Sequence, residues 1–458
     1  MDRWRRFKMT TKSMTPRDLH EFDAPPSDHH TSTASLRRAV VGVTCGNMIE
    51  WFDFALYSSL ATTIGRVFFQ NEDRATQLLS IYATFAAGFL IRPIGSFVFG
   101  PIGDRYGRRV ALTLSIALMS VATFCIAILP GYERIGMAAP ILLLCIRLLQ
   151  GLSTGGEYGG SCTFIAEHSP DKKRTFMTSW LEFGNISGFL LGGALVNLLT
   201  FSLGTASMEA WGWRIPFVVA GLAGLVALYL RLNVDESPVF KQMQENEKHQ
   251  KGLAKSKSIV QLLIEEWPQL LKCAGLTAVF NITYYVALGY IPGYLSDVVG
   301  HPVQFGNLLA MIATLVMLAF IPVAGWLGDR VGAKKMIGLG CAVIIVGAIP
   351  AFKLLSSPSV AIVFAGLMML VLAQLLFEGV MPATLASLFR APVRYSGLAI
   401  SYNVSVSLLG GTAPLINTWL IHRTGNPIIP AWYLMGGAVL GLIALKFVKD
   451  MTGKPLPM

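Results

Sequence analysis

Long apolar runs separated by short polar loops fill the chain from residue 39 to residue 449. Each run reaches about 20 residues, the length an α-helix needs to cross a hydrocarbon layer of roughly 30 Å. The predicted spans are 39–67, 76–103, 109–130, 138–167, 175–203, 213–233, 269–297, 303–328, 334–354, 358–389, 395–422 and 428–449. The pattern therefore predicts an all-α membrane protein with twelve transmembrane helices.

One polar loop occurs twice. Gly100-Pro-Ile-Gly-Asp-Arg-Tyr-Gly-Arg-Arg109 follows the second span, and Gly325-Trp-Leu-Gly-Asp-Arg-Val-Gly-Ala-Lys-Lys335 follows the eighth. An internal repeat of this kind predicts a duplicated fold with two pseudo-symmetric six-helix halves. The predicted parts are a disordered cytoplasmic tail (1–38), an N-terminal half (39–233), a cytoplasmic linker (234–268), a C-terminal half (269–449) and a short cytoplasmic tail (450–458).

The linker holds most of the Lys and Glu residues of its region. The stretch from Ile259 to Leu271 fits either an amphipathic helix lying on the membrane surface or a solvated connection. The sequence leaves both readings open.

Composition agrees with a bilayer as the solvent. Hydrophobic residues make up 53% of the chain and charged residues only 14%, and the mean hydropathy is +0.56, which excludes a soluble globule of this size. All six cysteines fall inside apolar runs without ligand spacing, so we expect buried thiols and neither a metal nor a disulfide. Because no cofactor loop or nucleophile motif is present, we expect no enzyme and no cofactor.

The net charge of +11 is spread over short loops, which disfavours a nucleic-acid partner and favours a topological role. The basic residues of alternate loops are Arg37, Arg38, Arg105, Arg108, Arg109, Lys172, Lys173, Arg174, Lys241, Lys248, Lys251, Lys255, Lys257, Arg330, Lys334, Lys335, Arg390, Arg394, Lys449 and Lys454. The opposite loops offer little beyond Arg66, Arg74, Arg134 and Arg423. The positive-inside rule then places both termini in the cytoplasm of a bacterial-type inner membrane, and we expect a monomer.

Ionisable side chains inside the predicted spans mark candidate functional positions, because a charge in the bilayer needs a cavity or a partner. They are Glu50, Asp53, Arg92, Arg147, Glu157, Glu182 and Glu378. Helical spacing groups them with other polar and aromatic residues into stripes: Asn47, Glu50, Phe54 and Tyr57, flanked by Trp51 and Asp53; Gln150, Thr154, Glu157, Tyr158 and Ser161; Asn281, Tyr284 and Tyr285; Gln374 and Glu378. We expect these stripes to line one cleft between the halves.

Together, these features resemble the major facilitator superfamily of secondary transporters. Motifs typical of its metabolite:proton symporter family run in order along the chain: Asn47-Met-Ile-Glu-Trp-Phe-Asp-Phe54, Arg92-Pro-Ile-Gly95, Gln150-Gly-Leu-Ser-Thr-Gly-Gly-Glu-Tyr158, Ser169-Pro-Asp-Lys-Lys-Arg174, Trp211-Gly-Trp-Arg-Ile-Pro-Phe217 and Asp235-Glu-Ser-Pro238. Ser179-Trp-Leu-Glu-Phe-Gly184, Asn281-Ile-Thr-Tyr-Tyr285 and Ala431-Trp-Tyr-Leu-Met435 are most similar to the proline and glycine-betaine transporters. Glu378 departs from that pattern and points to a different substrate as the alternative.

A proton symporter needs a carboxylate whose protonation changes with exposure and with a nearby cation. The candidates are Asp53, Glu157, Glu50 and Glu182, each with a structural buried ion pair as the alternative reading. Arg92 is a candidate to pair with Asp53 or Glu157, or to bind a substrate carboxylate. The other candidate substrate residues are Trp51, Tyr57, Asn281, Tyr284, Tyr285, Gln374 and Glu378; the aromatic ones suit a cationic nitrogen, although packing is their commoner role.

The resemblance also implies a gating latch at the repeated loop. Asp104 is expected to dock at the N-terminal end of a helix from the other half, where free backbone N–H groups favour a carboxylate. The latch set is Gly100, Asp104, Arg105, Arg108, Arg109, Glu167, Asp329 and Arg330, with Arg108 and Arg109 as expected partners of Glu167. Since Ala333 replaces the first arginine after the second loop, we expect the second latch to be weaker. The alternative reading is that both loops only enforce topology.

The leading functional prediction is proton-coupled symport of a small zwitterionic osmolyte such as proline or glycine betaine, with protons, substrate and lipid as partners. A proton symporter for citrate, 2-oxoglutarate or another organic acid is the main alternative. A drug:proton antiporter is disfavoured, because Asn185-Ile-Ser-Gly-Phe-Leu-Leu-Gly-Gly193 lacks the proline-marked pattern of that class. A sensor or scaffold is disfavoured because neither tail nor the linker is large enough for a folded domain.

Overall fold

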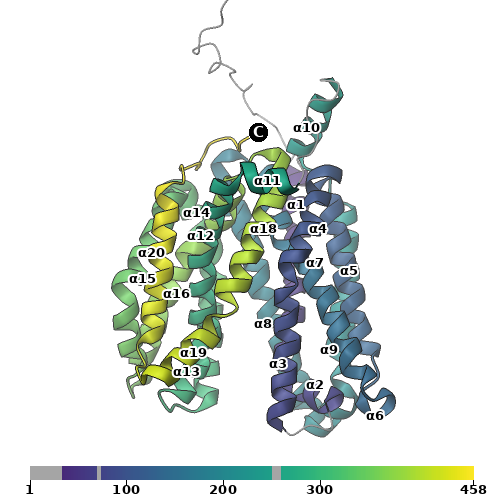
Figure 1. Cartoon of the computed structure of the whole chain (residues 1–458), viewed down its shortest axis with the longest axis vertical. Coiled ribbons are helices and arrows are strands. Elements are labelled where there is room, and N and C mark those ends of the chain that lie inside the picture. The colour runs from purple at the N-terminus through teal and green to yellow at the C-terminus, as the bar shows by residue number, and fades with distance from the viewer. Residues whose placement is uncertain (1–32, 70–73, 250–258) are drawn as a thin grey trace, which may run out of the picture. The chain divides into compact units, whose positions relative to one another are not determined.

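The computed structural model describes residues 33–69, 74–249 and 259–458. Helices make up nearly all of this part, and twelve of them are long and apolar enough to cross a membrane, which confirms the predicted number of spans. They form two bundles that stand side by side (Figure 1). The end that carries the linker helices and residues 447–458 is called the linker face below, and the other end the opposite face.

The N-terminal half contains the first six spans and the short helices that follow two of them. Its helices are α1 (Thr33–Ser59), α2 (Ala61–Phe68), α3 (Arg74–Leu90), α4 (Arg92–Tyr106), α5 (Arg108–Ile128), α6 (Tyr132–Ile135), α7 (Ala138–His168), α8 (Arg174–Ser207) and α9 (Arg214–Leu232). The first predicted span is therefore divided at Leu60. Helix α1 also begins earlier than predicted and takes in residues 33–38, whereas the rest of the predicted tail lies outside the described residues.

The C-terminal half repeats this arrangement with more interruptions. Its helices are α12 (Trp267–Tyr284), α13 (Ile291–Asp297), α14 (Val303–Val331), α15 (Ala333–Leu355), α16 (Val360–Glu378), α17 (Met381–Ala386), α18 (Arg394–Ser405), α19 (Ala413–Thr424) and α20 (Ile429–Lys446). Single π-helical turns, Tyr285–Tyr290 and Val406–Gly410, interrupt the seventh and eleventh spans. Such π-turns are frequent at functional sites.

The linker is partly helical. Helices α10 (Pro238–His249) and α11 (Ile259–Glu265) lie on the linker face (Figure 1). In α11 Leu262 is buried while Val260 and Ile264 are exposed. Part of the stretch is thus helical, but the helix ends at Glu265, before α12 begins at Trp267, and both readings of the stretch stay open.

The repeated loop has the same backbone in both halves. Gly107, between α4 and α5, has φ 114°, and Gly332, between α14 and α15, has φ 107°. L-amino acids other than glycine rarely adopt such values. Each glycine ends one span and starts the next in its half, so the structure reproduces the internal repeat seen in the sequence.

An acidic residue after the last span of each half faces this glycine. The backbone N–H groups of Arg108 and Arg109 donate to Glu236 at 3.2 and 3.1 Å, and the N–H of Ala333 donates to the hydroxyl of Thr452, which in turn donates to Asp450. Burial raises the pKa of the Glu236 carboxyl, and the N–H donors oppose that shift. Glu236 thus caps the helix after the first loop, and Thr452, bonded to Asp450, caps the helix after the second.

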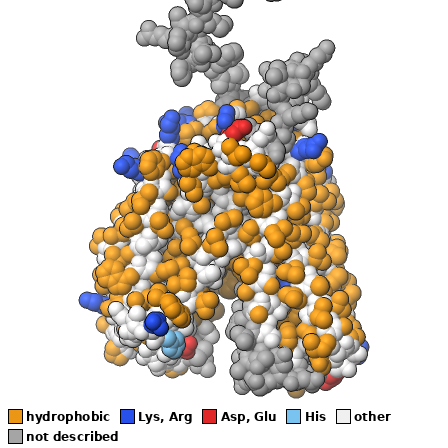
Figure 2. Space-filling model, in the orientation of Figure 1, with side chains coloured by type: hydrophobic (Ala, Val, Ile, Leu, Met, Phe, Trp, Pro, Cys, Tyr) orange, Lys and Arg blue, Asp and Glu red, His pale blue; other side chains and the backbone are white. Residues whose placement is uncertain are grey.

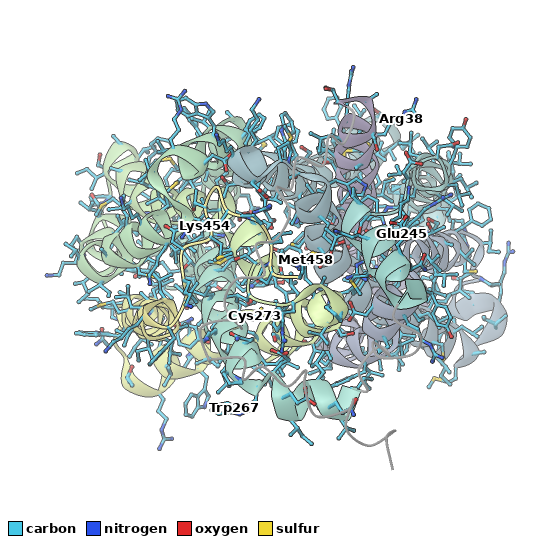
Figure 3. All side chains as sticks on the ribbon, turned by 90° about the horizontal axis from the view of Figure 1, so that it is seen from above. Arg38, Glu245, Trp267, Cys273, Lys454 and Met458 are labelled. Atoms are coloured by element: carbon cyan, nitrogen blue, oxygen red, sulfur yellow. The ribbon has the colours of Figure 1, made fainter. Side chains whose placement is uncertain are left out.

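The last nine residues pack across the linker face. Leu456 is buried, the guanidinium of Arg174 in α8 donates to the carbonyl of Lys454 at 2.7 Å, and the N–H of Ala391 donates to the carbonyl of Pro457 at 3.2 Å. In the view onto the linker face, Lys454 and Met458 lie towards the middle of the molecule (Figure 3). This segment therefore contacts both halves.

Apolar side chains cover the sides of the bundle, and Lys and Arg gather towards the linker face (Figure 2). Phe201 and Val346, for example, are 90% and 76% exposed, as expected for lipid-facing positions. Cys162, Cys273 and Cys341 are buried, but Cys145 is exposed on α7. The expectation of six buried thiols is therefore wrong for Cys145, because an apolar run in a membrane protein can face lipid.

Candidate functional site

Arg92 and Glu50 form a loose pair deep inside the bundle. The Nη2 atom of Arg92 lies 3.9 Å from Oε1 of Glu50, and the two side chains are each 4% exposed. The Arg92 guanidinium lies over the rings of Phe54 and Phe89, at 4.8 and 4.3 Å. Among the described residues, Arg92 Nε, Arg92 Nη2 and Glu50 Oε2 have no hydrogen-bond partner. Buried polar atoms with unused capacity indicate a place where a ligand can bind.

Aromatic rings from both halves surround this pair. Trp51 of the N-terminal half lies 5.8 Å from Tyr284 of the C-terminal half, and Phe89 lies 6.4 Å from Tyr285. Tyr284 and Tyr285 flank the start of the π-turn, which places two consecutive aromatic side chains at the boundary between the halves. The predicted aromatic residues Trp51, Tyr284 and Tyr285 are thus brought together around Arg92.

Tyr57 and Asn281 are not part of this cluster. Tyr57 lies inside the N-terminal half, where the guanidinium of Arg147 sits 3.6 Å from its ring centre. Asn281 is buried and donates to the carbonyl of Thr277, one turn back on the same helix. Tyr57 lies on nearly the same face of α1 as Glu50, but seven residues at 1.5 Å each place it about 10 Å further along the helix.

Asp53 is held in a dense polar cluster within the N-terminal half. Its carboxylate lies 3.0 Å from Arg147 and accepts bonds from Thr123 at 2.9 Å and Gln150 at 3.1 Å. All four side chains are buried. The expected pairing of Asp53 with Arg92 does not occur.

Glu157 pairs with Arg231, a residue that the sequence did not single out. Arg231 Nη1 donates to Glu157 Oε2 at 3.1 Å and to the carbonyl of Leu112 at 2.8 Å. Ser115 donates to the same carboxylate at 2.5 Å. The sequence feature that could have indicated this partner is an arginine between two leucines near the end of the sixth span. Arg92 therefore pairs with neither Asp53 nor Glu157.

Glu182 and Glu378 meet across the two halves. Tyr158 donates to Glu182 at 2.7 Å, and Gln374 donates to Glu378 at 2.8 Å. The ring of Tyr158 stacks on that of Tyr402 in α18 with centroids 3.7 Å apart. Gln374 and Glu378 are fully or almost fully buried, so they take part in contacts between helices in this conformation.

The latch geometry is present on the linker face. Asp104 accepts bonds from the backbone N–H groups of Tyr395 and Ser396 at 3.1 and 2.9 Å, in the first turn of α18. In mirror fashion, Asp329 accepts bonds from the N–H groups of Thr175 and Phe176, both at 2.9 Å, in the first turn of α8. Each acid thus uses helix N–H groups that have no partner within their own helix.

Ion pairs around Asp104 add further contacts between the two halves. Arg108 Nε lies 3.3 Å from Glu167, Arg394 Nη1 lies 2.6 Å from the same carboxylate, and Arg108 also donates to the carbonyl of Ala391 at 2.5 Å. The sequence analysis named Arg394 only as a basic loop residue and did not predict that it pairs with Glu167. The expected pairing of Arg109 with Glu167 is wrong, because the Arg109 side chain donates to the carbonyl of Leu232 in its own half.

Arg105 and Arg330 make no hydrogen bond or ion pair with described residues of the other half. Both are exposed, and their guanidinium groups lie over the neighbouring rings of Tyr106 and Trp326, respectively. In contrast, Gly100 permits close approach between the halves, since a side-chain carbon there would lie 2.9 Å from Ser396 Cα. Gly325 is the equivalent glycine in the second repeat: a side-chain carbon there would lie 2.5 Å from the hydroxyl oxygen of Ser179 in α8.

The two halves are closed on the linker face and apart on the opposite face. Deeper in the bundle than the latch, the amide of Asn403 in α18 donates to the hydroxyl of Ser96 in α4 at 2.9 Å, a contact that the sequence did not predict. On the opposite face the space-filling view shows a hollow between the bundles (Figure 2). Two similar halves that are joined at one end and apart at the other are the arrangement of an alternating-access transporter.

Comparison with known proteins identifies the family. The sugar (and other) transporter family matches residues 39–457. A glycine betaine/proline/ectoine/pipecolic acid transporter of Dickeya dadantii is 42% identical over 425 residues, which is 92% of this chain and 85% of the relative. The proline/betaine transporter of Escherichia coli K12 gives the same identity and coverage, and that of Salmonella typhimurium is 41% identical.

Solved structures agree on the fold. The major facilitator superfamily proton:xylose symporter XylE, bound to 6-bromo-6-deoxy-D-glucose, matches with a TM-score of 0.77 at 20% identity, covering 92% of this chain and 98% of that one. Its partially occluded inward-open form from E. coli matches with a TM-score of 0.66 at 19% identity, covering 93% and 100%. The chain belongs to the sugar (and other) transporter family.

Proposed function

We propose that the protein imports a small zwitterionic osmolyte, such as proline or glycine betaine, together with protons. Relatives that are 42% identical to the chain are proline and betaine transporters, which supports this substrate class. The concentration of Lys and Arg near the linker face supports a cytoplasmic position for that face in a bacterial-type inner membrane. Because one chain supplies both sides of the site, a monomer suffices for transport.

The observation that carries the proposal is the Arg92–Glu50 pair with its unused polar atoms. A zwitterion presents a carboxylate and a positive nitrogen a few ångströms apart. The two free nitrogen atoms of Arg92 suit the carboxylate, and Glu50 with the rings of Trp51, Tyr284 and Tyr285 suits the nitrogen. Ring and cation attract by about 0.5 to 2 kcal/mol each, so several rings together give useful affinity.

Proton coupling requires a carboxylate that is free to change its charge. Asp53 and Glu157 are held by close contacts to Arg147 and Arg231, which favours the structural reading of these two acids. Glu50 has only a loose partner at 3.9 Å, and no Lys, Arg or His among the described residues forms an ion pair with Glu182. We therefore propose Glu50 and Glu182 ahead of Asp53 and Glu157 as proton-coupling residues.

Uptake into proteoliposomes tests the proposal. Radiolabelled proline and glycine betaine should accumulate when a pH gradient, acidic on the side of the opposite face, is imposed, and a protonophore should abolish accumulation. Glu157→Gln and Asp53→Asn, where folded, should stay proton-coupled. If those two variants lost coupling while Glu50→Gln and Glu182→Gln kept it, the assignment of the acids would be wrong.

A carboxylate substrate is the second candidate. Arg92 offers two donor atoms without partners in a buried site, and a mono-, di- or tricarboxylate would use them equally well. Competition of citrate and 2-oxoglutarate against labelled proline separates the candidates. If only the organic acids inhibited, the substrate would be a carboxylate. If the protein took up neither osmolytes nor organic acids, both candidate functions would be wrong.

A further inference from the structure

Glu182 and Glu378 form a carboxyl pair at the boundary between the two halves. Glu182 lies on α8 of the N-terminal half, and Glu378 ends α16 of the C-terminal half. They are 4% and 1% exposed, and their carboxyl groups are close enough that one could donate a hydrogen bond to the other if it carried a proton. Two acids from different halves therefore meet at a position that is shielded from bulk solvent.

The groups facing this pair are neutral. Glu182 accepts bonds from the Tyr158 hydroxyl at 2.7 Å and the Asn185 amide at 2.7 Å, and Glu378 Oε1 accepts one from Gln374 at 2.8 Å. The other titratable neighbours of the pair are Tyr284, Tyr402 and Cys162. Within residues 33–69, 74–249 and 259–458, no Lys, Arg or His forms an ion pair with either glutamate.

Two ionised carboxylates in contact repel each other, and a nonpolar environment makes that repulsion stronger. One shared proton removes it, as in other carboxyl pairs that hold a single proton between them. The structure also shows which oxygen lacks a bond: Glu378 Oε2 is buried and receives none from a described side chain. A proton on Glu378 would let that carboxyl donate to Glu182, which already accepts two hydrogen bonds and is suited to remain the anion.

We propose that Glu182 and Glu378 share one proton in this conformation and release it when the linker face opens. On release the O–H bond of the Glu378 carboxyl breaks, the proton passes to water entering from the linker face, and two carboxylates remain. The proposal rests on the proposed proton symport and names an acid pair for it. In this proposal Glu378 binds a proton and does not contact the substrate.

The pair is connected to the latch through adjacent side chains. Asp104 fastens the first turn of α18, and Tyr402 on the same helix stacks on Tyr158, whose hydroxyl donates to Glu182. Movement of α18 away from the N-terminal half would separate the two rings and disturb the donor to Glu182. Opening of the latch and loss of the proton are thus expected to occur together.

Infrared difference spectroscopy of the full chain in lipid nanodiscs tests the proton directly. At neutral pH the wild type should show the absorption of a protonated carboxyl group, and Glu378→Gln and the double variant with Glu182→Gln should lose that component. In Glu182→Gln alone the band should shift, because an amide replaces the carboxylate that accepts the bond. Glu266→Gln is the matched control, since its carboxylate pairs with Arg390 on the linker face, and its spectrum should match the wild type.

Transport of the same samples separates this proposal from the proposed function. Glu378→Gln should lose the stimulation of uptake by a pH gradient while substrate exchange at equal pH continues. Absence of the band in the wild type, or an unchanged band in the double variant, would overturn the shared proton. A band that behaves as expected in a protein that takes up no osmolyte or organic acid would leave the pair standing and overturn the proposed symport. Should Glu378→Gln fail to fold, the band shift in Glu182→Gln decides.

Discussion

Asp104 and Ser396 join the two halves of the protein on the linker face: a carboxylate oxygen of Asp104 lies 2.9 Å from the backbone N–H of Ser396. Asp329 makes the mirror contact with α8. Each half therefore supplies both an acid and the start of a helix. The positive end of a helix favours a carboxylate at this place, so both contacts favour the closed linker face.

Asp104→Asn should leave the protein folded in the membrane but impair transport. The neutral amide loses the attraction between a charge and the helix start, worth up to about 2 kcal/mol in a partly buried site. A change of one or two kcal/mol shifts a two-state ratio about 5- to 30-fold. The initial rate of proline or betaine uptake, normalised to protein in the membrane, measures the effect.

Asp329→Asn should have the smaller effect of the two. Asp104 is buried and has Arg108 3.6 Å away, whereas Asp329 is only partly buried and has Ala333 in place of that arginine. Glu245→Gln, on the exposed surface of α10, is the control. Normal uptake in Asp104→Asn would rule the latch out, and a larger loss in Asp329→Asn would reverse their ranking.

Breaking the Glu157–Arg231 pair should destabilise the fold. Removing one partner of a buried ion pair leaves an uncompensated charge, at a cost of about 3–5 kcal/mol. Both Glu157→Gln and Arg231→Gln should lower the thermal unfolding temperature in detergent, and the double variant should recover part of the loss. Single variants as stable as the wild type would contradict a structural role for the pair.

Arg92→Lys should weaken substrate binding. Lysine keeps the positive charge but lacks the planar fork that can hold a carboxylate with two bonds. A hydrogen bond to a charged group contributes about 1.5–3 kcal/mol, so losing one should raise KM about tenfold or more. Arg423→Lys, on the exposed end of α19, is the matched control. An unchanged KM in Arg92→Lys would remove Arg92 from the site.

Deleting residues 451–458 should loosen the closed linker face. A crevice lined by Arg174, Asp329 and Thr452 lies beside Ala333, which matches Arg108 in the sequence repeat. The deletion removes Thr452 and the carbonyl groups of Lys454 and Pro457 that bond to Arg174 and Ala391. In a cysteine-free background, Ser387→Cys should then react faster with a thiol reagent applied from that face. Equal labelling rates with and without residues 451–458 would contradict this view.

Much of the architecture was predictable because membrane physics acts on the sequence directly. The span number follows from length and apolarity, and the repeat of Gly100 and Gly325 indicated the two halves. The docking of Asp104 followed from the family resemblance. These features depend on short segments and on helix ends.

Partner choice inside the bundle was less predictable. Arg92 pairs with neither expected acid, and Tyr57 faces Arg147 rather than the cavity. Lipid-facing positions are as apolar as core positions, so the hydrophobic pattern does not fix how each helix is rotated. Arg231, Arg394 and Asn403 were missed because their partners are distant in sequence and depend on that rotation.

Proton-driven uptake of proline and glycine betaine into proteoliposomes tests the central claim most directly. The account predicts accumulation driven by a pH gradient, loss of accumulation with a protonophore, and a raised KM in Arg92→Lys. Accumulation of citrate or 2-oxoglutarate without either osmolyte, or osmolyte uptake indifferent to the pH gradient, would contradict it.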